Sequence, residues 1–282
     1  MGGIGMDMNW LESLIYGLIS GAAEFLPISS QAHQSLLMQL FGVEMRDPVR
    51  DLLVHLAILL ALFSGCRSTF EHIRREQKQQ LHNRNGYRRS SRVLLDLRLI
   101  KNAAIPMLIG MLVVAYIFAQ NNNLLWMSVF LFINGVILFA PERMVQGNKD
   151  VRGMSAIDSF WIGISGGLSS FPGISRIGST TSAAVARGAD RQCALNWALL
   201  LSVPALVLLA GLDVIGIFSA AASLDVWGSL LTYILSAVGA YCGGYLSILL
   251  IKFLTVRAGY YGFAYYSWGA ALFAFLLYLT VV

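Results

Sequence analysis

Charged residues are scarce in this 282-residue chain. Lys, Arg, Asp and Glu together make up 12% of it, whereas soluble domains carry about 25%. Apolar residues reach 57%, and the mean hydropathy is +0.66. A water-soluble globule of this size has too little interior to bury so much apolar surface. The composition therefore excludes an ordinary soluble enzyme and a disordered protein, and it predicts an all-α polytopic membrane protein.

Cysteine and early positive charge are also lacking. The three cysteines show no CxxC pair and no metal-ligand spacing, which excludes a disulfide scaffold. No Lys or Arg precedes Arg46, so the N-terminus lacks the basic region of a cleavable signal peptide, and we expect the first apolar segment to remain in the mature protein. The apolar runs are long and unbroken, whereas strands of a membrane barrel alternate polar and apolar residues over about ten positions.

The positive charge that is present is concentrated in one loop. Between Cys66 and Lys101 ten Lys and Arg residues face three acidic ones, a balance of +7 that exceeds the +5 of the whole chain. Loops rich in Lys and Arg stay in the cytoplasm, so we place the 66–97 loop inside. A nucleic-acid patch is the alternative interpretation. We favour a topogenic loop near anionic lipid headgroups, with no nucleic-acid partner, because the loop joins two hydrophobic spans.

Six segments are apolar over about 20 residues, the length that crosses a bilayer. Followed outward from the basic loop, they place both termini on the outer side, in agreement with the lack of Lys and Arg there. The expected spans are 49–65, 98–119, 124–140, 192–218, 226–251 and 260–282.

Two further stretches, 11–41 and 157–190, do not fit as single spans. Each begins as an apolar helix, breaks at a proline, and resumes as a short helix with more polar residues. Ile-Ser-Gly, Pro and Ser recur in both at one constant offset, as Pro27 and Pro172 illustrate. Broken helices are tolerated at membrane depth only where they are buried in protein or line a wet cavity.

The recurrence predicts two inverted repeats within one membrane domain, 1–282. Each copy precedes three spans, and the topology gives the copies opposite orientations. The expected halves are 9–140 and 157–282, each with a re-entrant broken-helix hairpin, and such paired segments mark the binding site in repeat-built transporters. Chance similarity between two Gly- and Ser-rich helices is the alternative.

Ionisable residues inside membrane segments are costly, so each marks a candidate site. Glu24 follows apolar and small residues and should lie at depth. Ser30 and His33 share one helix face, and a histidine beside a serine can accept the hydroxyl proton of a nucleophile. Arg176 follows a Pro-Gly break at the start of a helix, where free N–H groups and a guanidinium suit phosphate oxygens. These residues predict an anion pocket for phosphate with a nucleophile pair across from it.

Structural roles are the alternatives for the same residues. Glu24 and Arg176 can form an ion pair that serves packing, and His33 can be a satisfied packing histidine. Serines after proline breaks routinely cap helices, and small hydroxyl residues pack helices together. The capping alternative applies to Ser29, Ser30 and Ser175. The packing alternative applies to Thr180, Thr181 and Ser182.

Three other ionisable residues belong to the neighbouring spans. Asp51 and His55 are four positions apart, so they can face the same cavity, and we give His55 at most an indirect role. Asp213 comes late in an outgoing span and is expected near the outer surface.

Two motifs resemble the signatures of a known family. Glu24-Phe-Leu-Pro-Ile-Ser-Ser30 with His33, and Pro172-Gly-Ile-Ser-Arg176 with Gly178 and Thr180, resemble those of the undecaprenyl-pyrophosphate phosphatase, or bacitracin-resistance, family. The resemblance covers nearly everything except the basic loop. It implies six spans plus re-entrant helices in an inverted repeat. It also implies removal of the terminal phosphate from undecaprenyl pyrophosphate at the outer side of the bacterial inner membrane, which recycles the lipid carrier of cell-wall glycans.

The resemblance also implies a role for each motif residue. Ser30 would be the nucleophile, His33 its proton-transfer partner and Arg176 the pyrophosphate clamp. Glu24 would help to hold a divalent cation, Mg²⁺ or Ca²⁺. The implied substrate-binding set is Ser20, Ser29, Ser175, Gly178 and Thr180.

Several positions depart from the family's pattern. They are Ser20, Gln31, Ala32, Ile177 and Ser267. Ser20 stands where the first motif usually has a second glutamate, and Ser267 where an arginine is usual in the last span. Mg²⁺ sites rely on one or two carboxylates plus substrate phosphates, so the change at Ser20 bears on metal-dependent catalysis rather than on phosphate binding.

We therefore predict an integral-membrane phosphatase for undecaprenyl or another polyprenyl pyrophosphate, located in the bacterial inner membrane. The alternative is a polyprenyl-phosphate transporter or flippase, or a phosphate-binding homologue without catalysis, since inverted repeats suit alternating access. The expected partners are the polyprenyl pyrophosphate lipid and the bilayer. The oligomeric state is left open, with a homodimer among the alternatives.

Overall fold

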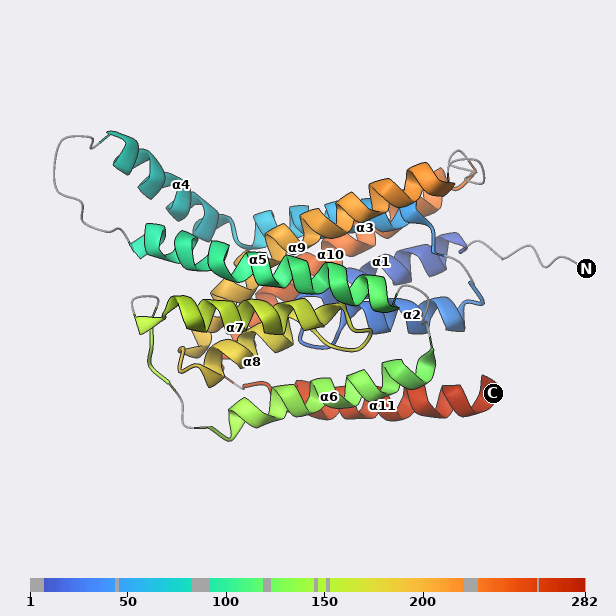
Figure 1. The fold of residues 1–282 in the computed structure, drawn as a ribbon. Coiled ribbons are helices and arrows are strands. Elements are labelled where there is room, and N and C mark those ends of the chain that lie inside the picture. The colour runs from blue at the N-terminus through green and yellow to red at the C-terminus, as the bar shows by residue number, and fades with distance from the viewer. Residues whose placement is uncertain are drawn as a thin grey trace, which may run out of the picture.

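A computed structural model describes residues 8–43, 46–82, 92–118, 123–144, 147–150, 153–220, 228–257 and 259–281. These residues are mostly helical, and the β-structure among them is one isolated bridge between Lys149 and Ala189. The helices are α1 Trp10–Phe25, α2 Ser30–Leu40, α3 Pro48–Gly65, α4 Arg67–His82, α5 Arg92–Phe118, α6 Leu124–Glu142, α7 Ala156–Gly167, the 3-10 helix η2 Leu168–Ser170, α8 Arg176–Ala186, α9 Arg191–Ala220, α10 Leu230–Arg257 and α11 Tyr261–Val281 (Figure 1).

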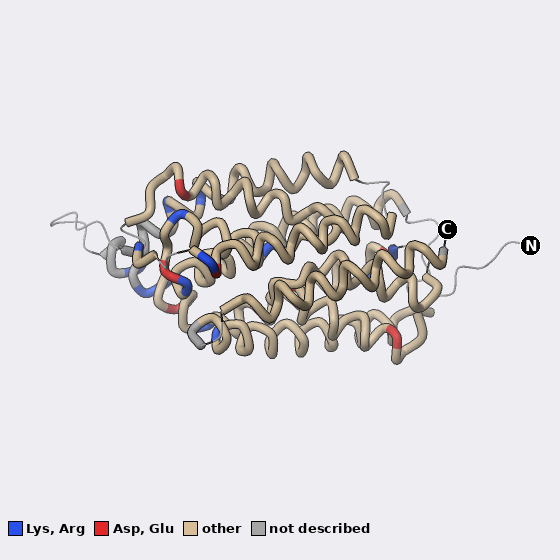
Figure 2. The backbone as a smooth tube through the Cα atoms, turned by 90° about the horizontal axis from the view of Figure 1, so that it is seen from below, with Lys and Arg blue, Asp and Glu red and all other residues tan. Residues whose placement is uncertain are grey.

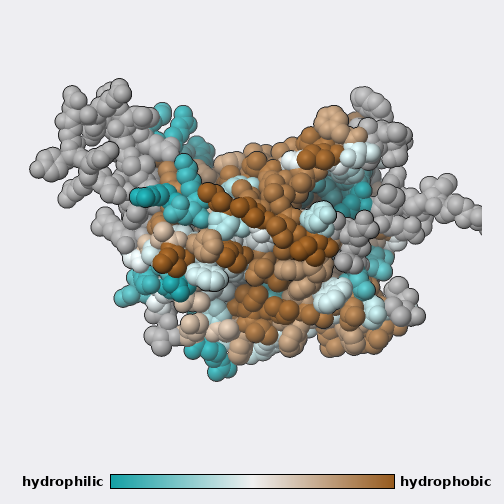
Figure 3. All heavy atoms as spheres, viewed as in Figure 1, coloured by the Kyte–Doolittle hydropathy of each residue, from teal (hydrophilic) through white to brown (hydrophobic). Residues whose placement is uncertain are grey.

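Six of these helices, α3, α5, α6, α9, α10 and α11, are long and apolar enough to cross a membrane. They match the six predicted spans, with ends that differ by a few residues. Large apolar side chains lie exposed on their outward faces, among them Leu60, Ile105 and Phe218. Figure 3 shows the resulting apolar surface across the middle of the protein. The predicted all-helical membrane architecture is confirmed.

Charge is distributed unevenly along the molecule. Lys and Arg gather mainly at one end of the bundle (Figure 2), the end beyond which α4 extends in Figure 1. The prediction that residues 66–97 form a loop is wrong in part, because α4 and the first turn of α5 fall within this range. Residues 83–91 lie outside the described residues. The charge distribution agrees with a cytoplasmic position for this end, and that orientation stays a prediction.

Two pairs of short helices lie among the long ones. Helices α1 and α2 contact each other, as do α7 and α8, and Figure 1 shows the two pairs toward opposite ends of the bundle. The longest of the four has 16 residues, fewer than the roughly 20 that cross a bilayer. This arrangement is compatible with two re-entrant hairpins of opposite orientation. Their depth in a bilayer and the inverted repeat stay predictions.

The breaks within these pairs have local causes. Helix α1 ends at Phe25, just before Pro27, whose ring disfavours helical backbone in the preceding residue. Ser29 then adopts a left-handed φ of 68° before it caps α2. In the second break Gly173 has a φ of +128°, and a Cβ there would lie 2.7 Å from the backbone nitrogen of Leu131, so this turn requires glycine.

Helices α1 and α10 pack with their backbones in close approach. A Cβ at Gly21 of α1 would lie 2.1 Å from the carbonyl oxygen of Ala240, and one at Gly243 of α10 would lie 2.1 Å from that of Leu18. Glycines and other small residues permit such close helix contacts within membranes, where lipid provides no hydrophobic drive for association. This contact holds α1, and with it Glu24, against the long helices.

Substitution of one glycine in this contact tests its importance. We expect Gly21→Ala to lower the free energy of unfolding by about 1–3 kcal/mol, because the new Cβ must push two helix backbones apart. The matched control is Gly269→Ala in α11, where a Cβ meets open space and the gain in helix propensity is similar, up to about 1 kcal/mol. Unfolding in detergent micelles measures both, and equal stability of the two variants would contradict the prediction.

Candidate active site

A cavity of about 160 Å³ lies where the two helix breaks meet. Its lining combines Glu24, Ser29 and Ser30 from the first break with Ser175 and Arg176 from the second. Helices α3, α5 and α9 complete the wall. The two motifs that are far apart in the sequence thus contribute to one cavity.

Glu24 joins the two motifs within this cavity. Arg176 donates from Nη2 to Oε1 of Glu24, and Ser30 donates from Oγ to Oε2 over 2.5 Å. The side chains of Glu24 and Arg176 are 5% and 6% exposed. Three of the four predicted catalytic residues are therefore in direct contact. The pairing of Glu24 with Arg176, considered above as a purely structural alternative, exists in the structure.

One nitrogen of Arg176 is available to donate a hydrogen bond to a ligand. It is the first residue of α8, and its Nε is buried without a hydrogen-bond partner among the described residues. A buried donor without a partner is costly unless a ligand satisfies it. The guanidinium fork of arginine matches phosphate oxygens, so this nitrogen suits an anion that enters the cavity.

Both ring nitrogens of His33 have partners other than Ser30. Its Nδ1 lies 2.7 Å from the carbonyl oxygen of Ser29, which can only accept, so Nδ1 carries the hydrogen. Nε2 then accepts from the hydroxyl of Tyr266, also at 2.7 Å, and the two rings stack with centroids 5.7 Å apart. His33 is not part of the cavity wall. The predicted pair of Ser30 and His33 does not form, because Ser30 donates to Glu24 instead.

The predicted substrate-binding residues divide into two groups. Ser29 and Ser175 line the cavity. Gly178, Thr180 and Ser20 do not: the N–H of Gly178 is capped by Ser175 Oγ at 3.1 Å, and Thr180 Oγ1 donates back to the carbonyl oxygen of Arg176 at 2.5 Å. Ser20 is fully buried, and its Oγ has no partner among the described residues.

The donor set does not fit a divalent cation held by the protein alone. Both oxygens of Glu24 are engaged with Arg176 and Ser30. Ser20, at the position of the second family carboxylate, offers only a hydroxyl. Within the described part of the chain no three His, Cys, Asp or Glu residues are grouped as metal ligands. Cation binding at Glu24 therefore stays a prediction.

Asn134 of α6 connects the two breaks, a role that the sequence analysis missed. Its Nδ2 donates to the carbonyl oxygen of Pro27 at 3.1 Å and to Ser267 Oγ at 3.0 Å. Its Oδ1 accepts from the backbone N–H of Ser175 at 2.9 Å. One fully buried amide therefore fixes both turns, and Ser267 of α11 supplies one of its partners.

His55 and Asp213 also line the cavity. His55 Nδ1 lies 2.6 Å from Asp213 Oδ2, and the pair links α3 to α9. The side chain of Asp213 is 16% exposed and lines the cavity, and its expected position near the outer surface stays a prediction. Asp51, by contrast, accepts a hydrogen bond from Tyr16 and is not part of this wall.

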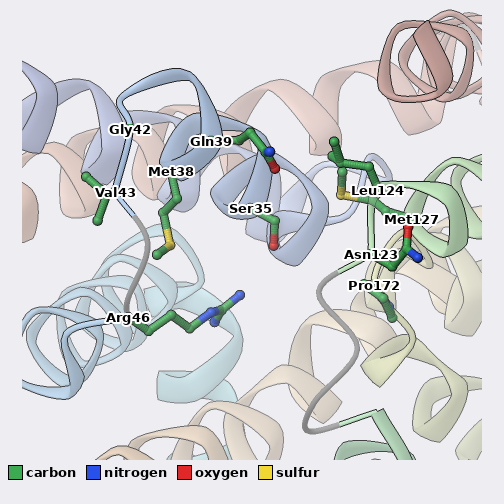
Figure 4. Close-up of a pocket in the computed structure, with 10 residues that line it drawn as sticks. All are labelled: Ser35, Met38, Gln39, Gly42, Val43, Arg46, Asn123, Leu124, Met127 and Pro172. Carbon is green, nitrogen blue, oxygen red and sulfur yellow. The ribbon is translucent and has the colours of Figure 1, made fainter. Parts of the chain in front are cut away.

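A larger cavity of about 350 Å³ adjoins the first through Arg46, which lines both. Figure 4 shows Arg46 extending into the same space as Ser35 of α2, with Asn123 on the opposite side. A second arginine is therefore present beside the catalytic candidates, and no motif contains it.

Comparison with known proteins places this site in context. The chain matches the family described as "Bacitracin resistance protein BacA" over residues 13–273. An undecaprenyl-diphosphatase of Carboxydothermus hydrogenoformans is 29% identical over 264 residues, which cover 93% of this chain and 94% of that protein.

Two further relatives are similar over nearly their full lengths. Undecaprenyl-diphosphatase 3 of Bacillus cereus is 30% identical over 276 residues, covering 98% of this chain and 100% of that protein. An undecaprenyl-diphosphatase of Thermosipho melanesiensis is 32% identical over 267 residues, covering 94% and 98%. With its six apolar spans, this multi-pass membrane protein belongs to the BacA bacitracin-resistance family.

Proposed function

We propose that the protein is an integral-membrane phosphatase that hydrolyses undecaprenyl diphosphate to undecaprenyl phosphate and inorganic phosphate, and so recycles the cell-wall lipid carrier. One observation carries the proposal: Glu24 and Arg176, both buried, and the half-buried Ser30 form one contiguous hydrogen-bonded set within one cavity. The full-length similarity to undecaprenyl-diphosphatases supports the same substrate.

In the proposed reaction Arg176 holds the terminal phosphate. Its buried Nε donates to a phosphate oxygen. The positive charge of the guanidinium then interacts with both Glu24 and the phosphate. Arg46, which also lines the cavity, adds a second positive charge. Phosphoryl transfer depends mainly on positioning and charge stabilisation, which two arginines that line one cavity supply.

Ser30 is the proposed nucleophile and Glu24 its base. Ser30 Oγ attacks the terminal phosphorus while its proton moves to Glu24 Oε2, with which it already shares a 2.5 Å hydrogen bond. The bond between that phosphorus and the bridging oxygen breaks, and polyprenyl phosphate leaves. His33, held by Ser29 and Tyr266, positions the start of α2 and thereby the Ser30 hydroxyl.

The distribution of Lys and Arg supports an orientation of the enzyme in the membrane. We place it in the bacterial inner membrane with α4 in the cytoplasm and both termini outside, because Lys and Arg gather at the α4 end. A homodimer stays an alternative. The donor set does not support a cation held without substrate, and the mechanism takes no step through one.

Phosphate release tests the proposed function. Detergent-purified protein is expected to release phosphate from undecaprenyl or farnesyl diphosphate, assayed with and without divalent metal ions. Absence of release under every metal condition would contradict the proposal. Transbilayer movement of labelled polyprenyl phosphate in proteoliposomes by such an inactive protein would instead identify a transporter.

Removal of the nucleophile gives the first prediction. We expect Ser30→Ala to lower phosphate release by about a thousandfold or more, since loss of a covalent nucleophile abolishes the main route. The control is Ser219→Ala, near the exposed end of α9. Both proteins should melt at similar temperatures. Near-normal release by Ser30→Ala would exclude Ser30 as the nucleophile.

The contact between His33 and Tyr266 gives the second prediction. Tyr266→Phe removes the hydrogen bond to Nε2 but keeps the stacked ring, so kcat should fall about fivefold, the value of one hydrogen bond. Its neighbour provides the control: Tyr265 is 60% exposed, and Tyr265→Phe should leave kcat unchanged. Equal kcat values for the two variants would show that the hydrogen bond to His33 does not position the site.

A further inference from the structure

A second acid–base pair borders the cavity outside both motifs. His55 of α3 and Asp213 of α9 are joined by the 2.6 Å contact between Nδ1 and Oδ2, and both line the cavity that holds Glu24, Ser30 and Arg176. Their side chains are 11% and 16% exposed. The two residues are 158 positions apart, so the fold rather than a local motif brings them together beside the reacting groups.

Asp213 determines which nitrogen of His55 carries the hydrogen. A carboxylate only accepts, so Nδ1 of the neutral ring is the donor and Nε2 carries the lone pair. Within the described part of the chain Nε2 has no hydrogen-bond partner. In His33, by contrast, both nitrogens are engaged. His55, and not His33, thus has a basic nitrogen available to a ligand or water.

The proposed reaction requires a second base. After the first step Glu24 holds the proton of Ser30, and the phosphoryl group is bound to Ser30 Oγ. The water that hydrolyses this group must lose a proton, and Glu24 is then already protonated. An imidazole oriented by a carboxylate has the chemistry for that proton transfer.

We propose that His55, oriented by Asp213, is the base that activates the hydrolytic water. The inference rests on the proposed phosphatase function. The water oxygen attacks the phosphorus while one of its protons moves to His55 Nε2, and the ionised Asp213 stabilises the resulting imidazolium. The bond between phosphorus and Ser30 Oγ breaks, and Oγ regains its proton from Glu24. Inorganic phosphate leaves, and His55 returns its proton to the solvent that refills the cavity.

The test separates the two chemical steps. With substrate labelled in the terminal phosphate, His55→Gln should release about one equivalent of polyprenyl phosphate per enzyme in a burst and retain the label on Ser30. Its steady release of phosphate should be at least about a hundredfold slower than that of the wild type, the usual contribution of a general base. Added imidazole should restore part of the rate to His55→Ala, an effect that a structural role would not produce.

Matched variants keep the outcome interpretable. His72→Gln, on the exposed face of α4, should behave as the wild type. The double variant Ser30→Ala/His55→Gln should retain no label. Should the His55 variants fail to fold, Asp213→Asn preserves the side-chain shape and should also accumulate labelled enzyme.

The two proposals fail in different ways. A wild type that releases no phosphate refutes the phosphatase function itself. An active wild type refutes the role of His55 if His55→Gln turns over at the wild-type rate. It is also refuted if the folded variant is slow with neither labelled enzyme nor rescue by imidazole, and His55 and Asp213 are then a contact that packs α3 against α9.

Discussion

A carboxylate and a guanidinium, both more than nine-tenths buried, face each other where the two helix breaks meet. Neither Glu24 nor Arg176 could be buried alone at acceptable cost, because an unpaired charge in a dry interior is destabilising by several kcal/mol. The pair therefore requires the end of α1 and the start of α8 to adjoin. It also leaves the Nε of Arg176 without a hydrogen-bond partner among the described residues, so the group that stabilises the site can also bind phosphate.

The surrounding structure maintains this meeting point with few polar contacts. Asn134 bonds to the backbone at Pro27 and at Ser175, so one amide fixes both turns. Its second donor bond reaches Ser267 of α11. The glycine contact between α1 and α10 then holds the first break against the long helices. These contacts come from helices that the motifs do not include.

The hydropathy pattern predicted the six long helices well, because a membrane span is a local property of about 20 residues. The two helix breaks were equally predictable, because proline and glycine affect the backbone conformation of the residues next to them. The structure of the basic segment after Cys66 was predicted only in part. Its charge suggested a loop, but opposite charges four positions apart, as in the pair of Arg67 and Glu71, also suit a solvent-exposed helix such as α4.

Side-chain partners were harder to predict from sequence. Spacing put Ser30 and His33 on one face of a helix, but Ser30 is the first residue of α2 and reaches back to Glu24, while His33 turns to Tyr266. The contacts of Tyr266 with His33, of Asn134 with Pro27 and of Asp213 with His55 each join residues more than 100 positions apart, and a single sequence contains no signal for them. Thr180 satisfies its hydroxyl within its own helix, which a motif match cannot distinguish from ligand binding.

The ion pair of Glu24 and Arg176 has two roles, because it joins the two breaks and forms the proposed phosphatase site. A double-mutant cycle with Glu24→Gln, Arg176→Gln and the combined variant tests it, with unfolding in micelles and phosphate release measured on each protein. We expect each single variant to lose about 3–5 kcal/mol of stability. The double variant should lose clearly less than the sum, and none of the three should release phosphate. Additive losses of stability, or phosphate release retained by Glu24→Gln, would show that the ion pair does not have both roles.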